Sequence, residues 1–203
     1  MALFPLRRNP PAAALPRSGS SVPAPGGLDF EAVYEENLSF VWKAARRLGI
    51  ETADTDDVVQ EVFLVAYRKL AEFEGRASIK TWLLKILMFV VRHHRRTRQR
   101  KPGLCSADSH QDLQGLHDSQ VHGPAEVAER AEAVRVLDGL LGQLDREKRE
   151  VFVLAEIEQL SSVEIAEILD ENVNTIYSRL RVARQEFQEA LALFHTSELG
   201  RQP

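Results

Sequence analysis

The sequence has little of what secreted, disulfide-linked or membrane-spanning proteins require. Cys105 is the single cysteine among the 203 residues, so the chain cannot form an intramolecular disulfide. The N-terminal stretch contains no leucine-rich core of a signal peptide. The most apolar stretch, residues 79–91, is too short and too interrupted by lysine to cross a bilayer. We therefore expect a cytoplasmic protein that is not inserted in a membrane.

Motifs for catalysis and cofactor binding are also missing. The sequence has no glycine-rich phosphate-binding loop, and no nucleophile, base and orienting group at a plausible spacing. One stretch gathers metal-ligating residue types, namely Cys105, His110, His117 and His122. These residues lack the close pairs typical of a zinc site, so a solvated linker is the preferred interpretation. We expect no enzyme activity, no cofactor, no metal and no small-molecule substrate; an enzyme would need a pocket that the sequence does not reveal.

The composition predicts two small helical domains. Hydrophobic residues make up 44% of the chain and charged residues 28%, which suits one moderate core or two small ones in a water-exposed protein. The net charge of −4 does not suggest nucleic-acid binding, but a global sum hides local clustering. Residues 92–101 contain six cations and no acid. This segment is therefore a candidate for contact with phosphates.

Proline and polar residues divide the chain. Residues 1–28 hold six of the nine prolines and are predicted to be a disordered tail, or alternatively a tether for a partner. Residues 102–124 have no apolar period and are predicted to be a flexible linker. The helical domains are expected at 29–101 and 125–194, followed by a short tail at 195–203.

Helical periodicity begins at Asp29, the expected N-cap of a helix that Gly49 ends. Its expected buried face comprises Phe30, Val33, Tyr34, Val41, Ala44 and Leu48. The next helix has an expected buried stripe made of Val59, Val62, Phe63, Ala66 and Leu70. Its opposite arc is polar around an exposed leucine, which suits a protein interface. That predicted interface comprises Asp57, Gln60, Glu61, Leu64 and Arg68. Asp57 also lies in the first helical turn, where its charge can simply stabilise the helix dipole.

A third helix is expected to start after the N-cap Ser78 and to interleave aromatic rings with cations along one edge. That edge comprises Trp82, Lys85, Phe89, Arg92 and Arg96, and the basic segment adds Arg95 and Arg98. Aromatic rings beside cations can stack bases and hold phosphates. Trp82 lies on an almost wholly apolar helix, so a place in the core is an equally open alternative.

The second domain has the pattern of a helix-turn-helix. A helix is expected from Ala125 to about Leu141, and Asp145 is the expected cap of a helix that runs to Glu158. Residues 161–164 match a capping box that opens a short helix, and a turn at 170–173 leads into a long helix.

The long helix separates into two faces. Its expected buried arc comprises Ile176, Leu180, Ala183, Phe187, Ala190 and Leu191. Side chains expected to reach base edges are Tyr177, Ser178, Arg181, Val182 and Gln185. Arg179 and Arg184 flank them, where phosphates would lie. A solvated amphipathic helix with solubilising arginines is the alternative.

These residues resemble a known family. Residues 57–64, followed by Trp82 to Ile86 and a basic tail, resemble region 2 of the extracytoplasmic-function bacterial sigma factors. Residues 151–154, 161–169 and 174–180 resemble region 4 of the same family, which adds Asn174 and Thr175 to the predicted DNA contacts. Helix-turn-helix patterns occur in many regulators, so the two matches in this order are more specific than either alone.

The resemblance implies a subunit that confers promoter specificity on RNA polymerase. Its first domain would bind core polymerase and the minus-ten element, and its second would read the minus-thirty-five element. The predicted partners are core RNA polymerase, promoter DNA and an anti-sigma factor. The rival interpretation is a helix-turn-helix regulator that acts without being a polymerase subunit.

Three positions depart from the family pattern. Phe89 stands where asparagine is frequent, which leaves open how an unpaired promoter base is held. Asp170 stands where glycine usually opens the turn, and aspartate can adopt positive φ at modest cost. Glu171 replaces an apolar residue, so Val173 is expected to anchor that turn alone.

Overall fold

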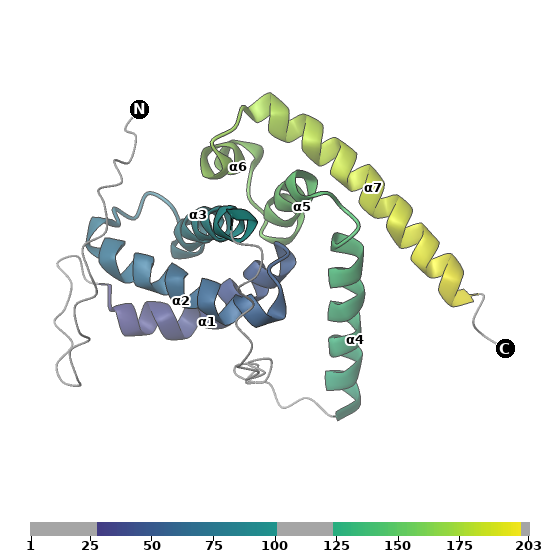
Figure 1. Cartoon of the computed structure of the whole chain (residues 1–203), viewed down its shortest axis with the longest axis horizontal. Helices are drawn as coiled ribbons and strands as arrows, with labels where there is room; N and C mark the ends of the chain where they lie inside the picture. Colours follow the sequence, from purple (N-terminus) through teal and green to yellow (C-terminus); the bar gives the residue numbers. More distant parts are fainter. Residues whose placement is uncertain (1–27, 101–123, 200–203) are drawn as a thin grey trace.

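The computed structural model describes residues 28–100 and 124–199 (Figure 1). Within them the protein is all-helical, as predicted, with no β-strand. Residues 1–27 of the predicted N-terminal tail, residues 102–123 of the predicted linker with Cys105 and its three histidines, and the end of the C-terminal tail lie outside the described residues. In the part of the chain that the structure describes, no helix has both the length and the apolar character needed to cross a bilayer.

The first domain is a bundle of three helices that all contact one another. Its elements are α1 (Phe30–Arg47), α2 (Thr52–Lys69), the short η1 turn (Leu70–Glu72) and α3 (Ile79–Arg100). The predicted caps are confirmed, since the Asp29 carboxylate accepts from Glu31 N–H at 3.2 Å and the Ser78 hydroxyl accepts from Thr81 N–H at 3.0 Å. Gly49 follows α1 with φ of +90°, a conformation that favours glycine.

The predicted stripe of α2 forms the centre of this bundle. Every residue of that stripe is buried, with Val62 and Ala66 at 0% exposure, while Leu64 on the opposite face is 46% exposed. The helical phase deduced from the sequence is therefore confirmed. Two residues of the α1 face differ. Phe30 is only half-buried, and Tyr34 is 39% exposed because its ring packs edge-on against Phe63 at the rim of a groove instead of entering the core.

The second domain has the predicted order of helices. Its elements are α4 (Pro124–Leu141), α5 (Arg146–Phe152), a π-helical turn (Val153–Ile157), α6 (Ser162–Leu169) and α7 (Val173–Leu199). Asp145 caps α5 by accepting from Lys148 N–H at 3.0 Å. The capping box is also confirmed, since Ser161 N–H donates to the Glu164 carboxylate at 2.9 Å and Glu164 N–H donates to the Ser161 hydroxyl at 3.3 Å.

The π-helical turn was not predicted. The sequence indicated continuous α-helix as far as Glu158, but five residues of that stretch form the wider turn, and Gln159 after it has φ of +57°. Val153 and Leu154, the first two residues of this turn, are both fully buried. A widened turn rotates successive side chains differently from an α-helix, so hydrophobic periodicity at 3.6 residues cannot indicate it.

The two domains pack against each other. Figure 1 shows α5 between the first-domain helices and α7, with α6 beside α3. Buried residues of both domains form one continuous hydrophobic cluster. The sequence predicted two domains on a tether and gave no indication that they would share a packed boundary.

The turn between α6 and α7 contains Asp170 at φ +54° and ψ +49°, in the left-handed region. Asp170→Gly should raise the free energy of unfolding by about 0.5 kcal/mol, because glycine adopts this conformation without a steric penalty. Urea denaturation followed by circular dichroism measures the change.

Glu167→Gly is the matched control, because the same residue type is introduced on an exposed position inside α6. It should lower stability by about 1 kcal/mol. Equal losses in both variants would contradict the left-handed assignment at Asp170.

Candidate nucleic-acid interface and partner surface

The outer side of α1 and α2 forms a groove of about 600 Å³. Of the residues predicted for a protein interface, Asp57, Gln60 and Leu64 line it, and all three are exposed. Glu61 is half-buried and Arg68 exposed on the same helix, but neither lines the groove. An apolar centre with a charged rim is the composition expected of a surface that binds another protein.

Sequence reasoning missed the aromatic wall of this groove. Phe30 packs edge-on against Tyr67 with ring centroids 5.0 Å apart, and Tyr67 is 65% exposed. The Trp42 indole donates to the Asp56 carboxylate at 3.0 Å, which ties α1 to α2 beside the groove. The signal available in the sequence was the presence of three large aromatic residues, Phe30, Tyr34 and Tyr67, on the first two helices.

The predicted aromatic and cationic edge of α3 divides into two parts. Lys85 is exposed and Phe89 is 49% exposed, four residues apart on one face. Trp82 is half-buried, packs against the hydrophobic core and lies 5.2 Å from the Phe73 ring between centroids. Trp82 therefore contributes to packing, and Phe89 is the more accessible ring for stacking.

The arginines that follow are engaged in ion pairs. The Arg95 guanidinium donates to the Glu150 carboxylate and to the Leu48 carbonyl. Arg92 donates to the Leu169 carbonyl at 2.8 Å and lies 3.9 Å from Glu150. In this conformation both guanidinium groups are engaged by Glu150 of the second domain, and their predicted contact with the minus-ten element stays a prediction.

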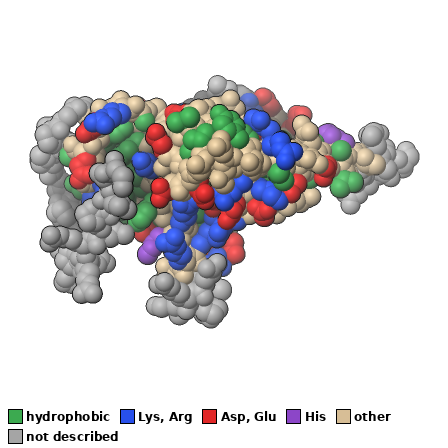
Figure 2. All heavy atoms as spheres, turned by 90° about the horizontal axis from the view of Figure 1, so that it is seen from above, with side chains coloured by type: hydrophobic (Ala, Val, Ile, Leu, Met, Phe, Trp, Pro, Cys, Tyr) green, Lys and Arg blue, Asp and Glu red, His purple; other side chains and the backbone are tan. Residues whose placement is uncertain are grey.

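The end of α3 is also charge-paired. Arg98 pairs with the Asp54 carboxylate and, at 2.9 Å, with Glu51. Arg96 is exposed and makes no ion pair with the described residues. On the face seen in Figure 2, Lys and Arg side chains lie among acidic ones and do not form one continuous basic band.

The exposed face of α7 carries most of the residues predicted to read bases. Tyr177 is 57% exposed, and Ser178, Arg181 and Gln185 are exposed as well. The remaining predicted positions comprise exposed Asn174 and half-buried Thr175 and Val182. The Ser178 hydroxyl donates to the Asn174 carbonyl at 2.9 Å, and its lone pairs remain available as acceptors.

The two flanking arginines of α7 have acidic partners. Arg179 pairs with Glu147 at 2.8 Å and with Glu171 at 3.1 Å, and Arg184 donates to Glu156 at 2.8 Å. Glu171, which departs from the family pattern, therefore holds the Arg179 guanidinium in an ion pair. A phosphate at these positions would have to compete with a carboxylate for each guanidinium.

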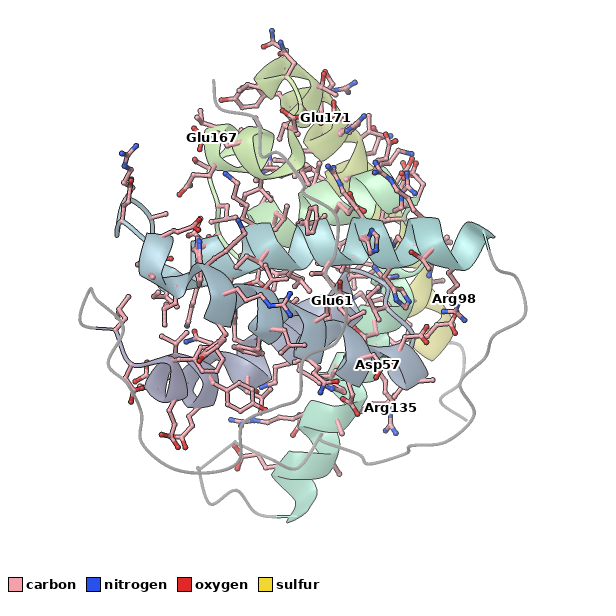
Figure 3. All side chains as sticks on the ribbon, turned by 60° about the vertical axis from the view of Figure 1, so that its left-hand side comes forward. Asp57, Glu61, Arg98, Arg135, Glu167 and Glu171 are labelled. Atoms are coloured by element: carbon pink, nitrogen blue, oxygen red, sulfur yellow. The ribbon has the colours of Figure 1, made fainter. Side chains whose placement is uncertain are left out.

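The predicted surfaces point in different directions. Figure 3 shows Asp57 and Glu61 on one side of α3, and Glu167 and Glu171 on the other. The groove on α2 and the turn that precedes α7 are thus separated by α3. No group of three or more metal-ligating side chains is gathered within the two described stretches.

The boundary between the domains holds two titratable groups with shifted pKa values. Burial raises the pKa of the Glu158 carboxyl, and attraction to Arg47, whose guanidinium lies 3.4 Å away, opposes this. Burial also lowers the pKa of the Arg149 guanidinium, which donates to the Arg47 carbonyl at 2.5 Å and the Arg46 carbonyl at 3.2 Å.

The raised pKa of Glu158 makes stability depend on pH. The folded chain holds a proton on this carboxyl more readily than the unfolded chain, so the contribution of Glu158 is fully present below its unfolded pKa. It is lost as the pH rises through the folded pKa. Compared with Glu158→Gln, the parent should therefore become relatively less stable as the pH rises from about 4 to 7. Chemical denaturation across this range measures the difference, and parallel curves would show that Glu158 does not titrate differently on folding.

Comparison with known families shows two matches in chain order. The family description "Sigma-70 region 2" matches residues 33–101, and "Sigma-70, region 4" matches residues 135–187. The first match covers the α2 groove and α3, and the second covers the helix-turn-helix.

Individual relatives match most of the chain. It is 34% identical to "RNA polymerase sigma factor CnrH" of Cupriavidus metallidurans, over 73% of this chain and 79% of the relative. It is 30% identical to "ECF RNA polymerase sigma-E factor" of Haemophilus influenzae, over 68% of this chain and 75% of the relative.

Two solved structures share the fold. CnrH in complex with the cytosolic domain of CnrY covers 81% of this chain and 88% of its own, with a TM-score of 0.56 at 27% identity. The sigma factor RpoE in complex with the anti-sigma factor NepR from Bartonella quintana covers 80% and 96%, with a TM-score of 0.59 at 25% identity.

Proposed function

The chain belongs to the extracytoplasmic-function group of RNA polymerase sigma factors, and on that premise we propose a division of labour between its domains. The first domain binds core RNA polymerase and the minus-ten element, and the second reads the minus-thirty-five element. The observation that carries the proposal is the presence, in one chain and in family order, of an exposed apolar groove on α2 and an exposed polar face on α7.

Core polymerase binds the groove of α1 and α2. Leu64 supplies an apolar contact at its centre, and Asp57 and Gln60 supply polar contacts beside it. Glu61 and Arg68 extend the contact along the same helix. Exposed Tyr67 adds an aromatic side chain of the type enriched in protein interfaces.

The minus-ten element is held along α3. Exposed Phe89 stacks an unpaired base and Lys85 lies one helical turn away on the same face, where it can neutralise a phosphate. The half-buried Trp82 also forms part of this surface. The basic segment extends this surface with four arginines, Arg92, Arg95, Arg96 and Arg98. Of these four, Arg96 is exposed and makes no ion pair with the described residues.

The minus-thirty-five element is read in the major groove by the first turns of α7. Arg181 and Ser178 face solvent on one side of the helix and carry the base contacts, with Tyr177, Val182 and Gln185 beside them. Asn174 and Thr175 lie at the helix N-terminus, where backbone N–H groups attract phosphate. Arg179 and Arg184 bind the sugar-phosphate backbone of the DNA when its phosphates displace their carboxylate partners.

The relatives support two further proposals. CnrH and RpoE were each solved with a protein partner, named an anti-sigma factor in the second case, and an anti-sigma factor is accordingly a partner of this chain as well. The chain acts as a transcription initiation factor in the cytoplasm, and the polymerase that it directs performs the catalysis.

Promoter-specific transcription tests this function directly. The purified chain is added to core polymerase with a library of promoter fragments, and transcripts are sequenced. Initiation at a defined pair of elements supports the proposal. Sequence-specific DNA binding by the chain alone, without any transcription, would instead support the helix-turn-helix regulator.

Leu64→Asp tests the polymerase surface. An aspartate there should abolish co-elution with core polymerase, because an unpaired charge would be buried among apolar atoms of the partner. The melting temperature of the free chain should barely move, since surface substitutions usually stay within about 0.5 kcal/mol.

Val62→Asp is the control for this experiment, because Val62 is fully buried two residues earlier on α2. It should unfold the domain. If Leu64→Asp remains folded and still binds polymerase, the interface lies elsewhere.

Arg181→Ala and Ser178→Ala test the α7 surface. Each should relax the preference at one position of the minus-thirty-five element by about 1–3 kcal/mol, because a base contact is lost while the fold is retained. Transcription from a panel of upstream-element variants measures this. Arg135→Ala is the control, since Arg135 pairs with Glu132 on α4, and Figure 3 shows it at the opposite end of the molecule from Glu171. An unchanged preference in both α7 variants would refute the assignment.

A further inference from the structure

Two carboxylates share the guanidinium group of Arg179 on α7. Its Nη1 atom lies 3.1 Å from the carboxylate of Glu171, in the turn before α7, and its Nη2 atom lies 2.8 Å from the carboxylate of Glu147 on α5. Both terminal nitrogens are therefore engaged, each by a different acid. The three side chains together carry a net negative charge, which opposes the approach of a phosphate.

Neighbouring contacts hold both carboxylates in place. Glu171 N–H donates to the Ala166 carbonyl at 3.0 Å, which ties the turn to α6. Lys148, next to Glu147 in the first turn of α5, donates to the Glu186 carboxylate of α7 at 2.6 Å. Neither carboxylate is therefore carried on a loose segment, and their pairing with α7 is part of the packed helix-turn-helix.

The arginines of α7 differ in a way that follows their predicted roles. Arg184, predicted to bind phosphate like Arg179, is also paired, because its Nε and Nη2 atoms lie 2.8 and 2.7 Å from one oxygen of Glu156. Arg181, predicted to read a base edge, is exposed and makes no ion pair with the described residues. The cations that would bind DNA of any sequence are thus neutralised, and the cation that would read one sequence is left unpaired within the described part of the chain.

From this pattern we infer that Glu171 and Glu147 determine specificity by restricting Arg179 to the phosphates of a correctly seated duplex. Phosphate contacts carry no sequence information, so a restriction on them weakens binding to other sequences most. On an arbitrary sequence α7 gains no base contacts, and a phosphate does not displace the two carboxylates. On the minus-thirty-five element, base contacts from Arg181 and Ser178 hold α7 in the groove, where a phosphate can replace them. The inference rests on the proposed function, because that function assigns α7 to this element.

Glu171→Gln is the principal test, because it removes the charge and keeps the shape of the side chain. Binding of the full chain to a labelled duplex of arbitrary sequence is measured by fluorescence anisotropy at several salt concentrations. Glu171→Gln should bind this duplex about fivefold tighter than the parent, and the slope of log affinity against log salt should steepen by about 0.9, the value for one additional phosphate contact. A role of Glu171 in folding alone would leave this slope unchanged.

Glu167→Gln is the matched control. It removes the same charge four residues earlier, at the same end of the molecule (Figure 3), from an exposed side chain that makes no ion pair with the described residues. It should change neither the affinity nor the slope. In a chain that carries Arg179→Ala, adding Glu171→Gln should also give no gain. An equal gain from Glu167→Gln, or a gain that persists without Arg179, would show a general loss of repulsion and overturn the inference.

Transcription by the holoenzyme is the second measurement, because it includes the correctly seated promoter. Templates with an intact upstream element are compared with templates in which that element is scrambled. Glu171→Gln and Glu147→Gln should each reduce the preference for the intact element about threefold, chiefly by raising initiation from the scrambled templates. An unchanged preference would overturn the role in specificity. If the parent initiates at no promoter, the proposed function fails, and the salt slope on the arbitrary duplex still decides whether the two acids restrain Arg179.

Discussion

A carboxylate that is almost excluded from water is costly to bury unless cations and hydrogen-bond donors surround it. Glu150 meets this requirement through Arg92 and Arg95, which lie on another domain. The α5 helix must therefore lie against α3, and the π-helical turn and the helix-turn-helix that follow it are positioned from there. Arg149, which is also on α5, makes a second contact with the first domain by donating to the Arg47 carbonyl at the end of α1.

Because the second domain packs against α3, one of the proposed binding surfaces is covered and the other two remain exposed. The groove on α1 and α2 and the outer face of α7 lie away from the boundary, with exposed Leu64 and Tyr177. The basic end of α3 lies at the boundary, and its arginines have internal partners. A sigma factor with this arrangement can present two of its three proposed binding surfaces while the third is occupied by its own second domain.

Much of the fold could be predicted from the sequence. The core stripe around Val62, the exposed position of Leu64, the caps at Asp29 and Asp145 and the capping box at Ser161 are confirmed. Each depends on residues within one or two helical turns, and such interactions follow from helical geometry alone. The family resemblance rested on the same local patterns, which is why it anticipated the order of the two regions.

The sequence alone thus determined most of the helices and buried faces, and the family resemblance. Only the tertiary structure decided which cations are available, because Arg95 and Glu150 are 55 residues apart in the chain and nothing in either local pattern predicts their pairing. The groove wall of Phe30, Tyr34 and Tyr67 likewise requires two helices to meet. The physical reason is one of range: hydrophobic periodicity and capping act through neighbouring backbone groups, whereas ion pairing depends on three-dimensional proximity, which exists only once the domains have packed.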